Sequence, residues 1–508
     1  MNILVIRMHR FGDILQLTPM LLGLKNKYPF CSITFLTGSE MSELLADNPA
    51  VDKVISIPER EYRYWLKNSP EEYPRIFNAM YDLISRLRQK HFQIVVNRQY
   101  EWGAIIAHLI GAEKVLGGAY SPDKGYFFKD DTSKNLFDTI RNDRRLNQRN
   151  LVDWACRIVR IPHEQNRRML FCPSSFAYRQ ARHLLNHDKN RSKRSMVAVQ
   201  TGAAKSFRQW GVENYTHIVQ WLIDEKERTV VLVGSEDEKD LGEHIEHRIG
   251  RQKAELINLI GRTSLNSLGG VLESCECLIT GDTGTMHMAA AVGTPVLSLF
   301  FGTAYPWETG PYGTGHFVLY SDISCAPCIG PAFCQDGHRC KYQIKPDIVK
   351  KAFESADAFW KNNLVYWEPY NNGVKLLVTV RDEMGEQMLL PVDKASNLRL
   401  EFSRMVPRQD DMEPNDAEAL IHKGDEVVCA FLKGEDEKGF LIFTEYLDLW
   451  LEAKDLLLSG YPAMGQTLSG LLEGCFYAMQ NKDPVSLMDA VEYGFKPLIQ
   501  QTLVKGQG

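Results

Sequence analysis

Residues 276–303 read ECLITGDTGTMHMAAAVGTPVLSLFFGT, and the first prediction of the fold comes from this stretch. The apolar run at 277–280 predicts a buried parallel strand, and the run at 296–301 predicts the next one. Between them lie a turn of small polar residues, 281–285, and a helical segment that ends near Gly293. A strand, a glycine-rich turn, a helix and a second strand form a βαβ unit. The stretch therefore predicts a parallel sheet covered by helices.

The turn at 281–285 is a candidate phosphate site. In a βαβ unit it lies at the carboxyl end of a strand, where the free N–H groups of the next helix attract phosphate. Asp282 could orient the turn, Thr283 and Thr285 can donate hydroxyl hydrogen bonds, and His287 is expected in the first helical turn. An ordinary tight turn would have the same shape, so this stretch alone leaves both interpretations open.

The length and charge of the chain limit its class. At about 100–200 residues per domain, 508 residues suggest about three domains. The formal net charge of −5 gives no argument for a nucleic-acid partner. No apolar run approaches the roughly 20 residues that cross a bilayer, and residues 1–7 begin a strand rather than a signal peptide. We therefore expect a cytoplasmic protein without a transmembrane segment.

Strands and helices alternate in two series, which predicts two doubly wound α/β domains. The first domain is expected at 1–175 and the second, after a basic linker, at 195–365. Within the first domain, residues 58–80 are expected to form an insertion or mobile loop, and residues 118–150 look charged and irregular. Two successive Rossmann-like halves would face each other across a cleft.

Three turns are expected to face that cleft, because ligands bind at the carboxyl ends of strands in such sheets. The first contains Asp13, just after Gly12, and the second contains the cations Lys205 and Arg208. The third is the turn at 282–287. A carboxylate at a strand-to-helix turn suits a cleft, although Asp13 could also simply cap its helix.

Several of these segments, taken in order, resemble one known family. The first reads IRMHRFGDI at 6–14, and another reads GDTGTMHMAAA at 281–291. Residues 202–210, 234–238 and 258–264 fit as well. Together they resemble glycosyltransferase family 9, the ADP-heptose:lipopolysaccharide heptosyltransferases. The resemblance covers about residues 1–365 and implies a GT-B fold.

The resemblance implies a role for each matching residue. Asp13 matches the family's proposed general base, which would deprotonate the acceptor hydroxyl as it attacks the anomeric carbon. The turn Thr283, Gly284 and Thr285 matches the part that holds the leaving diphosphate, beside Asp282. His287 matches the histidine of the same motif.

The cation that binds the diphosphate departs from the family pattern. The family carries Lys-x-Trp, whereas this chain has Arg208 two positions before Trp210. Arginine can bind phosphate through two N–H groups, and Lys205 is a second candidate. Glu238 matches an acidic position that could contact the ribose, or it could simply place a charge at a helix N-terminus.

Four of the eleven cysteines form a cluster at 325–340 with the spacing C-x2-C-x5-C-x5-C. The cluster consists of Cys325, Cys328, Cys334 and Cys340, with His338 as a spare ligand. Four thiolates at such spacing can enclose zinc or iron, which would be structural, whereas the alternative is a loop of reduced thiols. The resemblance adds that autotransporter-modifying members of the family hold iron at similar cysteines. No organic cofactor is expected.

Residues 366–508 lie outside the resemblance. Strands expected at 374–380, 388–391, 398–402 and 440–443, with helices over 445–505, predict an extra α+β domain. This domain could assemble the chain into an oligomer, dock an acceptor protein or stabilise the rest.

The predicted function is an inverting glycosyltransferase that moves a sugar, heptose from ADP-heptose, to a hydroxyl of the lipopolysaccharide core or another glycan. Such an acceptor could bring the enzyme into peripheral contact with a membrane. One alternative is a protein O-glycosyltransferase, and another is a scaffold that binds nucleotide sugars without catalysis. A dinucleotide oxidoreductase is disfavoured because Gly12 stands alone after the first strand, without a Gly-x-Gly-x-x-Gly pattern.

Overall fold

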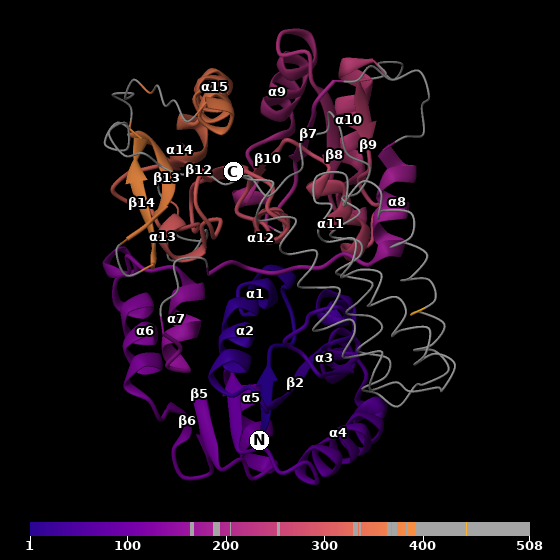
Figure 1. Ribbon diagram of the computed structural model, residues 1–508, viewed down its shortest axis with the longest axis vertical. Coiled ribbons are helices and arrows are strands. Elements are labelled where there is room, and N and C mark those ends of the chain that lie inside the picture. Colours follow the sequence, from indigo (N-terminus) through magenta and orange to yellow (C-terminus); the bar gives the residue numbers. More distant parts are fainter. Residues whose placement is uncertain are drawn as a thin grey trace, which may run out of the picture. The chain divides into compact units, whose positions relative to one another are not determined.

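The computed structural model describes residues 1–392, apart from short gaps, together with Phe443 (Figure 1). The gaps are 163–166, 186–193, 204, 251–254, 329–333, 335–336, 363–366, 368–372 and 383–384. The chain divides into two compact units, Met1–Val406 and Pro407–Gly508. All elements given below belong to the first unit.

The first half of this unit contains a six-stranded sheet in the order β3-β2-β1-β4-β5-β6. Its strands are β1 (Asn2–Ile6), β2 (Ser32–Gly38), β3 (Lys53–Ile57), β4 (Ile94–Asn97), β5 (Lys114–Ser121) and β6 (Gly125–Phe128). Only β6 is antiparallel to its neighbour. In the register of β1 and β4, Ile6 lies opposite Asn97. Arg7 and Arg98 therefore leave the sheet side by side at its carboxyl edge.

The second half contains an eight-stranded sheet in the order β14-β13-β12-β11-β10-β7-β8-β9. Its strands are β7 (Met196–Gln200), β8 (Thr229–Val233), β9 (Leu256–Asn258), β10 (Cys277–Gly281), β11 (Val296–Phe300), β12 (Phe317–Ser321), β13 (Val374–Arg381) and β14 (Gln387–Pro391). Strands β7 to β12 run parallel, whereas β13 and β14 are antiparallel additions at one edge. The predicted βαβ unit around residues 277–303 supplies β10 and β11, which are adjacent.

Helices cover both sheets (Figure 1). Those of the first half, in chain order, are α1 (Phe11–Leu15), α2 (Thr18–Lys27), η1 (Ser39–Leu45), α3 (Glu59–Asn68), η2 (Pro70–Glu72), α4 (Tyr73–Arg88), α5 (Tyr100–Leu109), α6 (Asp131–Asn142), η3 (Arg144–Leu146) and α7 (Leu151–Ile158). The next helix in the chain, α8 (Ser175–Leu185), packs against the second half. The second half has η4 (Ser206–Arg208), α9 (Val212–Asp224), η5 (Glu236–Glu238), α10 (Lys239–Ile249), α11 (Leu265–Glu273), α12 (Gly284–Ala291), α13 (Pro306–Thr309), α14 (Arg339–Gln343) and α15 (Pro346–Asn362).

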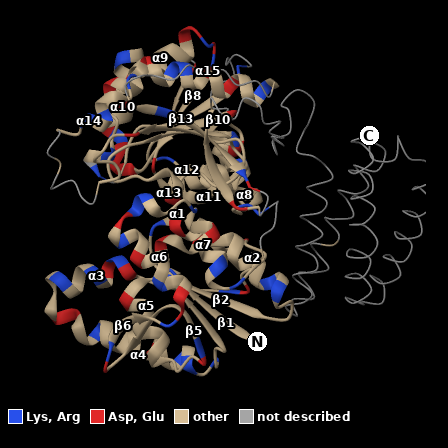
Figure 2. Cartoon of the chain, turned by 90° about the vertical axis from the view of Figure 1, so that its left-hand side faces the viewer, with Lys and Arg blue, Asp and Glu red and all other residues tan. Residues whose placement is uncertain are grey.

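Charge and apolarity are divided between these layers. Figure 2 shows that the charged residues lie mostly on the helices, whereas the strands carry few of them. Strands β8, β10 and β11 are buried along their whole length, as expected for parallel strands covered on both faces. The two Rossmann-like α/β halves predicted from the sequence are thus confirmed. None of the described helices is long and apolar enough to span a membrane.

Two segments that we expected to be irregular are largely regular, and that expectation was wrong. Residues 58–80 contain α3, η2 and the start of α4, because Pro70 and Pro74 occupy first-turn positions, where a missing N–H is harmless. Residues 118–150 contain β6, α6 and η3, and the side chain of Asp130 caps α6. The helices of both segments lie at the surface and are rich in charged residues, which is why their sequence looked irregular.

The second sheet continues beyond residue 366, where we expected a separate domain to begin. Strand β13 pairs antiparallel with β12, with Leu319 opposite Leu376, and β14 pairs with β13. The boundary between the compact units falls later, after Val406. The strands expected at 398–402 and 440–443 and the helices expected over 445–505 fall almost wholly outside the described residues.

Candidate active site

The two halves of the unit meet where α1 packs against α12, between the two sheets (Figure 1). Two glycines make this approach possible. A Cβ atom on Gly12 would lie 2.6 Å from the Cδ2 atom of His287, and one on Gly284 would lie 2.3 Å from the Phe11 ring. A larger residue at either position would push the helices apart. The loop around Asp13 and the turn at 281–287 are therefore in direct contact.

Asp13 lies in α1 and forms an ion pair with Arg7, which follows β1. The same guanidinium donates through Nη1 to the backbone oxygen of Arg98, at 2.5 Å. Arg7 is largely buried, whereas Asp13 keeps 29% of its side chain exposed. The carboxylate is thus held from one side and open on another. A hydroxyl could approach it there, which general-base chemistry requires.

The turn at 281–287 is fixed by contacts with β7 and α1. The Thr283 hydroxyl donates to Oε1 of Gln200 at 3.1 Å. His287 is buried in α12, and its Nε2 lies 3.4 Å from Nε2 of Gln16. Burial lowers the pKa of His287 to about 4, against a weaker effect of Asp13. His287 is therefore neutral near pH 7 and can accept a hydrogen bond from the Gln16 amide.

Arg208 lies directly beside this turn. Its Nη1 donates to Oδ2 of Asp282 at 3.2 Å, and its Nε donates to Oγ1 of Thr303 at 2.8 Å. Burial raises the pKa of Asp282, Arg208 opposes that shift, and Asp13 adds to it. Asp13 lies in α1 and Asp282 lies just before α12, and these two helices pack against each other. The Lys205 side chain, by contrast, is exposed and pairs with none of the described residues.

The Glu238 side chain lies beside the carboxyl ends of β7 and β8. A Cβ atom on Gly202 would lie 2.1 Å from its Cδ, and one on Gly234 would lie 2.3 Å from its Oε2. Its carboxylate accepts from the backbone N–H of Ser235 at 3.1 Å in a capping box, so the capping interpretation matches the structure. Burial raises the pKa of Glu238. A ribose contact stays a prediction.

The structure also shows four neighbours of the site that no sequence pattern had pointed to as functional. Arg7, Gln16, Gln200 and Thr303 contact the predicted residues directly. Arg7 falls within the matching motif at 6–14, and Thr303 ends the stretch 276–303, so their positions carried a signal. Gln16 and Gln200 carried no such signal, because a lone amide just after a helix or at the end of a strand has no characteristic spacing.

The cysteine cluster lies next to the site. The backbone N–H of Cys328 donates to the carbonyl of Gly302 at 2.9 Å, one residue before Thr303. Burial raises the pKa of Cys328, and the charges of Cys325, Cys340 and Cys334 raise it further. Among the described residues, which omit 329–333 and 335–336, no three potential ligands are arranged to hold a metal ion.

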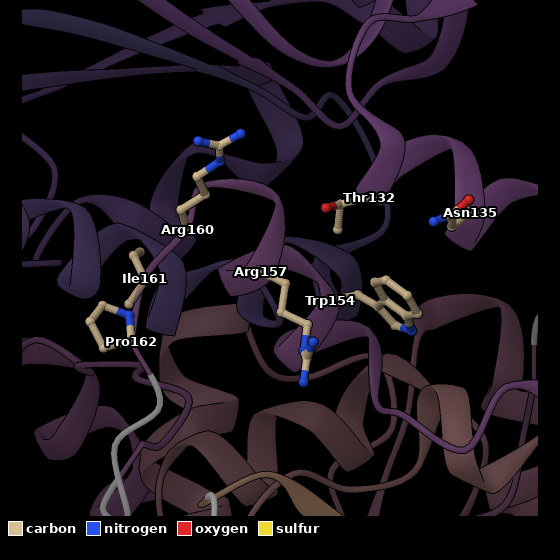
Figure 3. Close-up of a pocket in the computed structure, with 7 residues that line it drawn as sticks. All are labelled: Thr132, Asn135, Trp154, Arg157, Arg160, Ile161 and Pro162. Carbon is tan, nitrogen blue, oxygen red and sulfur yellow. The ribbon is translucent and has the colours of Figure 1, made fainter.

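A separate pocket of about 500 Å³ lies on α6, α7 and the residues after them (Figure 3). It is lined by Thr132, Asn135, Trp154, Arg157, Arg160, Ile161 and Pro162. None of the predicted site residues lines it. Figure 3 shows the guanidinium groups of Arg157 and Arg160 pointing in different directions, so they do not converge on one ligand.

Comparison with known proteins gives the same family as the sequence motifs. The family described as "Glycosyltransferase family 9 (heptosyltransferase)" matches residues 80–332. Lipopolysaccharide heptosyltransferase 3 of Escherichia coli is 24% identical over 302 residues, covering 58% of this chain and 84% of that protein. Lipooligosaccharide heptosyltransferase 2 of Haemophilus influenzae is 25% identical over 324 residues, covering 61% and 86%.

A solved structure shares the architecture. The structure of E. coli ADP-heptose lps heptosyltransferase II superposes with a TM-score of 0.53 at 21% sequence identity. The match covers 72% of this chain and 99% of that one. The predicted GT-B fold is therefore confirmed.

Proposed function

We propose, because the chain belongs to glycosyltransferase family 9, that its site transfers a heptose from ADP-heptose to a hydroxyl of a lipopolysaccharide-core glycan. Membership of this family makes the chain a glycosyltransferase. The names of its relatives, which are heptosyltransferases of lipopolysaccharide and lipooligosaccharide, support the donor sugar and the acceptor. A cytoplasmic location is part of the same proposal, since the donor is a nucleotide-activated sugar.

One observation carries the proposal: a partly exposed carboxylate from the first half lies beside the phosphate-type turn of the second. Asp13 lies in α1, which packs against α12, the helix that carries His287. The glycine contacts at Gly12 and Gly284 set this approach. A base and a leaving-group site in contact are what a direct displacement at a sugar carbon needs.

The proposed step can be written with these residues. Asp13 takes the proton of the acceptor hydroxyl, and the oxygen bonds to the anomeric carbon as the bond to the diphosphate breaks. Attack from the face opposite the leaving group inverts that carbon. Arg208 and the N–H groups at the start of α12 would stabilise the charge that develops on the diphosphate. The leaving group is ADP, which keeps the electron pair of the broken bond. The reaction is a displacement, so it needs no oxidant or reductant.

The test is acceptor-dependent release of ADP by the purified full chain. We expect release with ADP-heptose and a core glycan that lacks heptose, and little with UDP-glucose or GDP-mannose. ADP at a hundred times its dissociation constant should raise stability by about 2.7 kcal/mol. Mass spectrometry shows whether heptose has been added to a glycan or to a peptide. Addition to the peptide alone would favour the protein O-glycosyltransferase. Binding of ADP without turnover on any acceptor would favour a non-catalytic scaffold and contradict the proposal.

We also propose that the cysteine cluster holds a structural zinc or iron ion. The four thiols supply the soft donor set that these metals take, and the pKa of Cys328 responds to the other three. Metal binding would draw the thiols into a tetrahedral arrangement. Since Cys328 donates to Gly302, the metal would fix the loop that carries Thr303.

Elemental analysis of the purified protein should find about one zinc or iron per chain, the occupancy of a single four-ligand site. Cys328→Ser should remove most of this metal and lower the melting temperature. The matched control is Cys172→Ser, which lies outside the cluster and should keep the metal. Absence of stoichiometric metal, with an unchanged melting temperature in Cys328→Ser, would contradict the metal site.

A further inference from the structure

One arginine of the first half reaches into the second half beside the diphosphate-type turn. Arg144 begins η3, and its Nε donates to Oε2 of Glu308 at 2.9 Å. Its Nη1 donates to the carbonyl of Thr303 at 2.9 Å. Glu308 is only 2% exposed, so a nearly desolvated carboxylate receives this guanidinium. Such charge-assisted forked contacts have a defined geometry and hold the arginine in one orientation.

The contacts continue from Arg144 to the cation of the site. Thr303, whose carbonyl accepts from Arg144, uses its hydroxyl to accept from Nε of Arg208 at 2.8 Å. Arg208 in turn donates through Nη1 to Asp282. One continuous series of hydrogen bonds therefore runs from the first half to the turn at 281–287. Arg144 also opposes the burial-driven rise in the pKa of Asp282, which places its charge near that carboxylate.

These contacts leave part of Arg208 available to a ligand. Two of its guanidinium nitrogens are engaged, Nε by Thr303 and Nη1 by Asp282. Its Nη2 makes no hydrogen bond with the described part of the chain. An arginine that is already oriented loses less side-chain freedom when it binds phosphate, because that freedom was lost on folding.

Residues that follow Arg144 in the chain also form hydrogen bonds with the second half. The Asn150 side chain donates to the carbonyl of Gly310 at 3.2 Å, and the hydroxyl of Tyr312 donates to Asp153 at 2.6 Å. Arg145, the next residue, is different because it is 59% exposed and pairs with Asp143 of its own segment. The two neighbouring arginines thus form a natural test pair.

We propose that Arg144 is a positioning residue that fixes Arg208 through Thr303, so that donor binding depends on how the two halves are docked. This inference rests on the proposed function, since it assigns a nucleoside diphosphate to Arg208. Arg144 itself needs no contact with substrate in this role. The specific expectation is energetic coupling between Arg144 and Arg208, two residues that share Thr303 as a partner.

The test is a double-mutant cycle read by the affinity for ADP in calorimetry. We expect Arg144→Ala to weaken ADP binding about tenfold in the otherwise unchanged protein, and less than about twofold when Arg208 is already alanine. Arg145→Ala is the matched control and should bind ADP like the unchanged protein. Equal fold losses from Arg144→Ala in both backgrounds would overturn the positioning role.

A second variant separates a loss of positioning from a loss of folding. Arg144→Ala leaves the buried Glu308 without its cation, which destabilises proteins on its own account. Arg144→Lys keeps a positive charge for Glu308 but loses the fork that also reaches Thr303. We expect it to stay folded, by its melting curve, and still to bind ADP several-fold more weakly. Full ADP affinity in this variant would overturn the inference.

The transfer reaction separates this inference from the proposed function. For Arg144→Ala we expect the KM for the donor to rise, with a smaller decrease in kcat. If the protein without substitutions binds no ADP, both proposals are overturned. Normal acceptor-dependent ADP release, combined with independent effects of Arg144→Ala and Arg208→Ala, would overturn the positioning role alone.

Discussion

Asp13→Asn is expected to reduce acceptor-dependent transfer by about 10²–10⁴-fold, the range that a positioned general base contributes. Asparagine cannot take the proton of the attacking hydroxyl, whereas its side-chain oxygen can still accept from Arg7. The fold of α1 should therefore survive. Single-turnover measurement of ADP release, with donor and acceptor saturating, reports the loss directly.

The affinity of this variant for ADP provides the control. Asp13 belongs to the first half, and the diphosphate-type turn belongs to the second, so ADP binding should remain nearly intact. Asp52→Asn removes an aspartate that pairs with Lys25 at the surface and should leave transfer unchanged. Near-normal turnover by Asp13→Asn would show that another group is the base.

Arg208→Ala is expected to lower kcat by about 10²–10³-fold, as loss of one donor to a developing negative charge does. It should also weaken ADP binding, because the same guanidinium is expected to face the diphosphate before and during transfer. Steady-state kinetics with varied donor, together with calorimetry with ADP, measure both effects. Arg208→Lys should recover only part of the loss, since lysine cannot form the fork.

Lys205→Ala decides between the two cations that the sequence left open. The Lys205 side chain is exposed and unpaired in the described structure, and substitutions at such positions usually change stability by less than about 0.5 kcal/mol. We expect its transfer rate to stay close to that of the unchanged protein. A loss as large as that of Arg208→Ala would give the diphosphate role to Lys205 instead.

The sequence predicted the parts of the fold whose signals are local. Apolar runs such as 296–301 became buried strands, and the glycine-rich turn at 281–285 lies between β10 and α12, as its residue types require. A proline can be misinterpreted when its position within a helix is not known. Pro74 lies in the segment 58–80 that we expected to be a loop, yet it stands in the first turn of α4, a position that tolerates proline.

The rest of the site depends on contacts between residues far apart in the chain. Arg144 and Glu308 are 164 positions apart, and Gln16 and His287 are 271 apart. No periodicity or spacing encodes such pairs, because only the docking of the two halves brings them together. The motifs placed Asp13 and the turn at 282–287 on facing elements, whereas Gln16, Gln200 and Arg144, which support the site, came from positions that looked irregular or ordinary.

The antiparallel addition of β13 and β14 decides how far this chain can be shortened. Strand β12 is an inner strand only because β13 covers its free side, and Leu376 and Val378 are almost wholly inaccessible to water. A truncated protein that stopped near residue 365 would expose the main-chain donors and acceptors of β12. Such an unpaired edge strand promotes self-association. The smallest version of this enzyme that remains dispersed should therefore extend past Pro391, the end of β14.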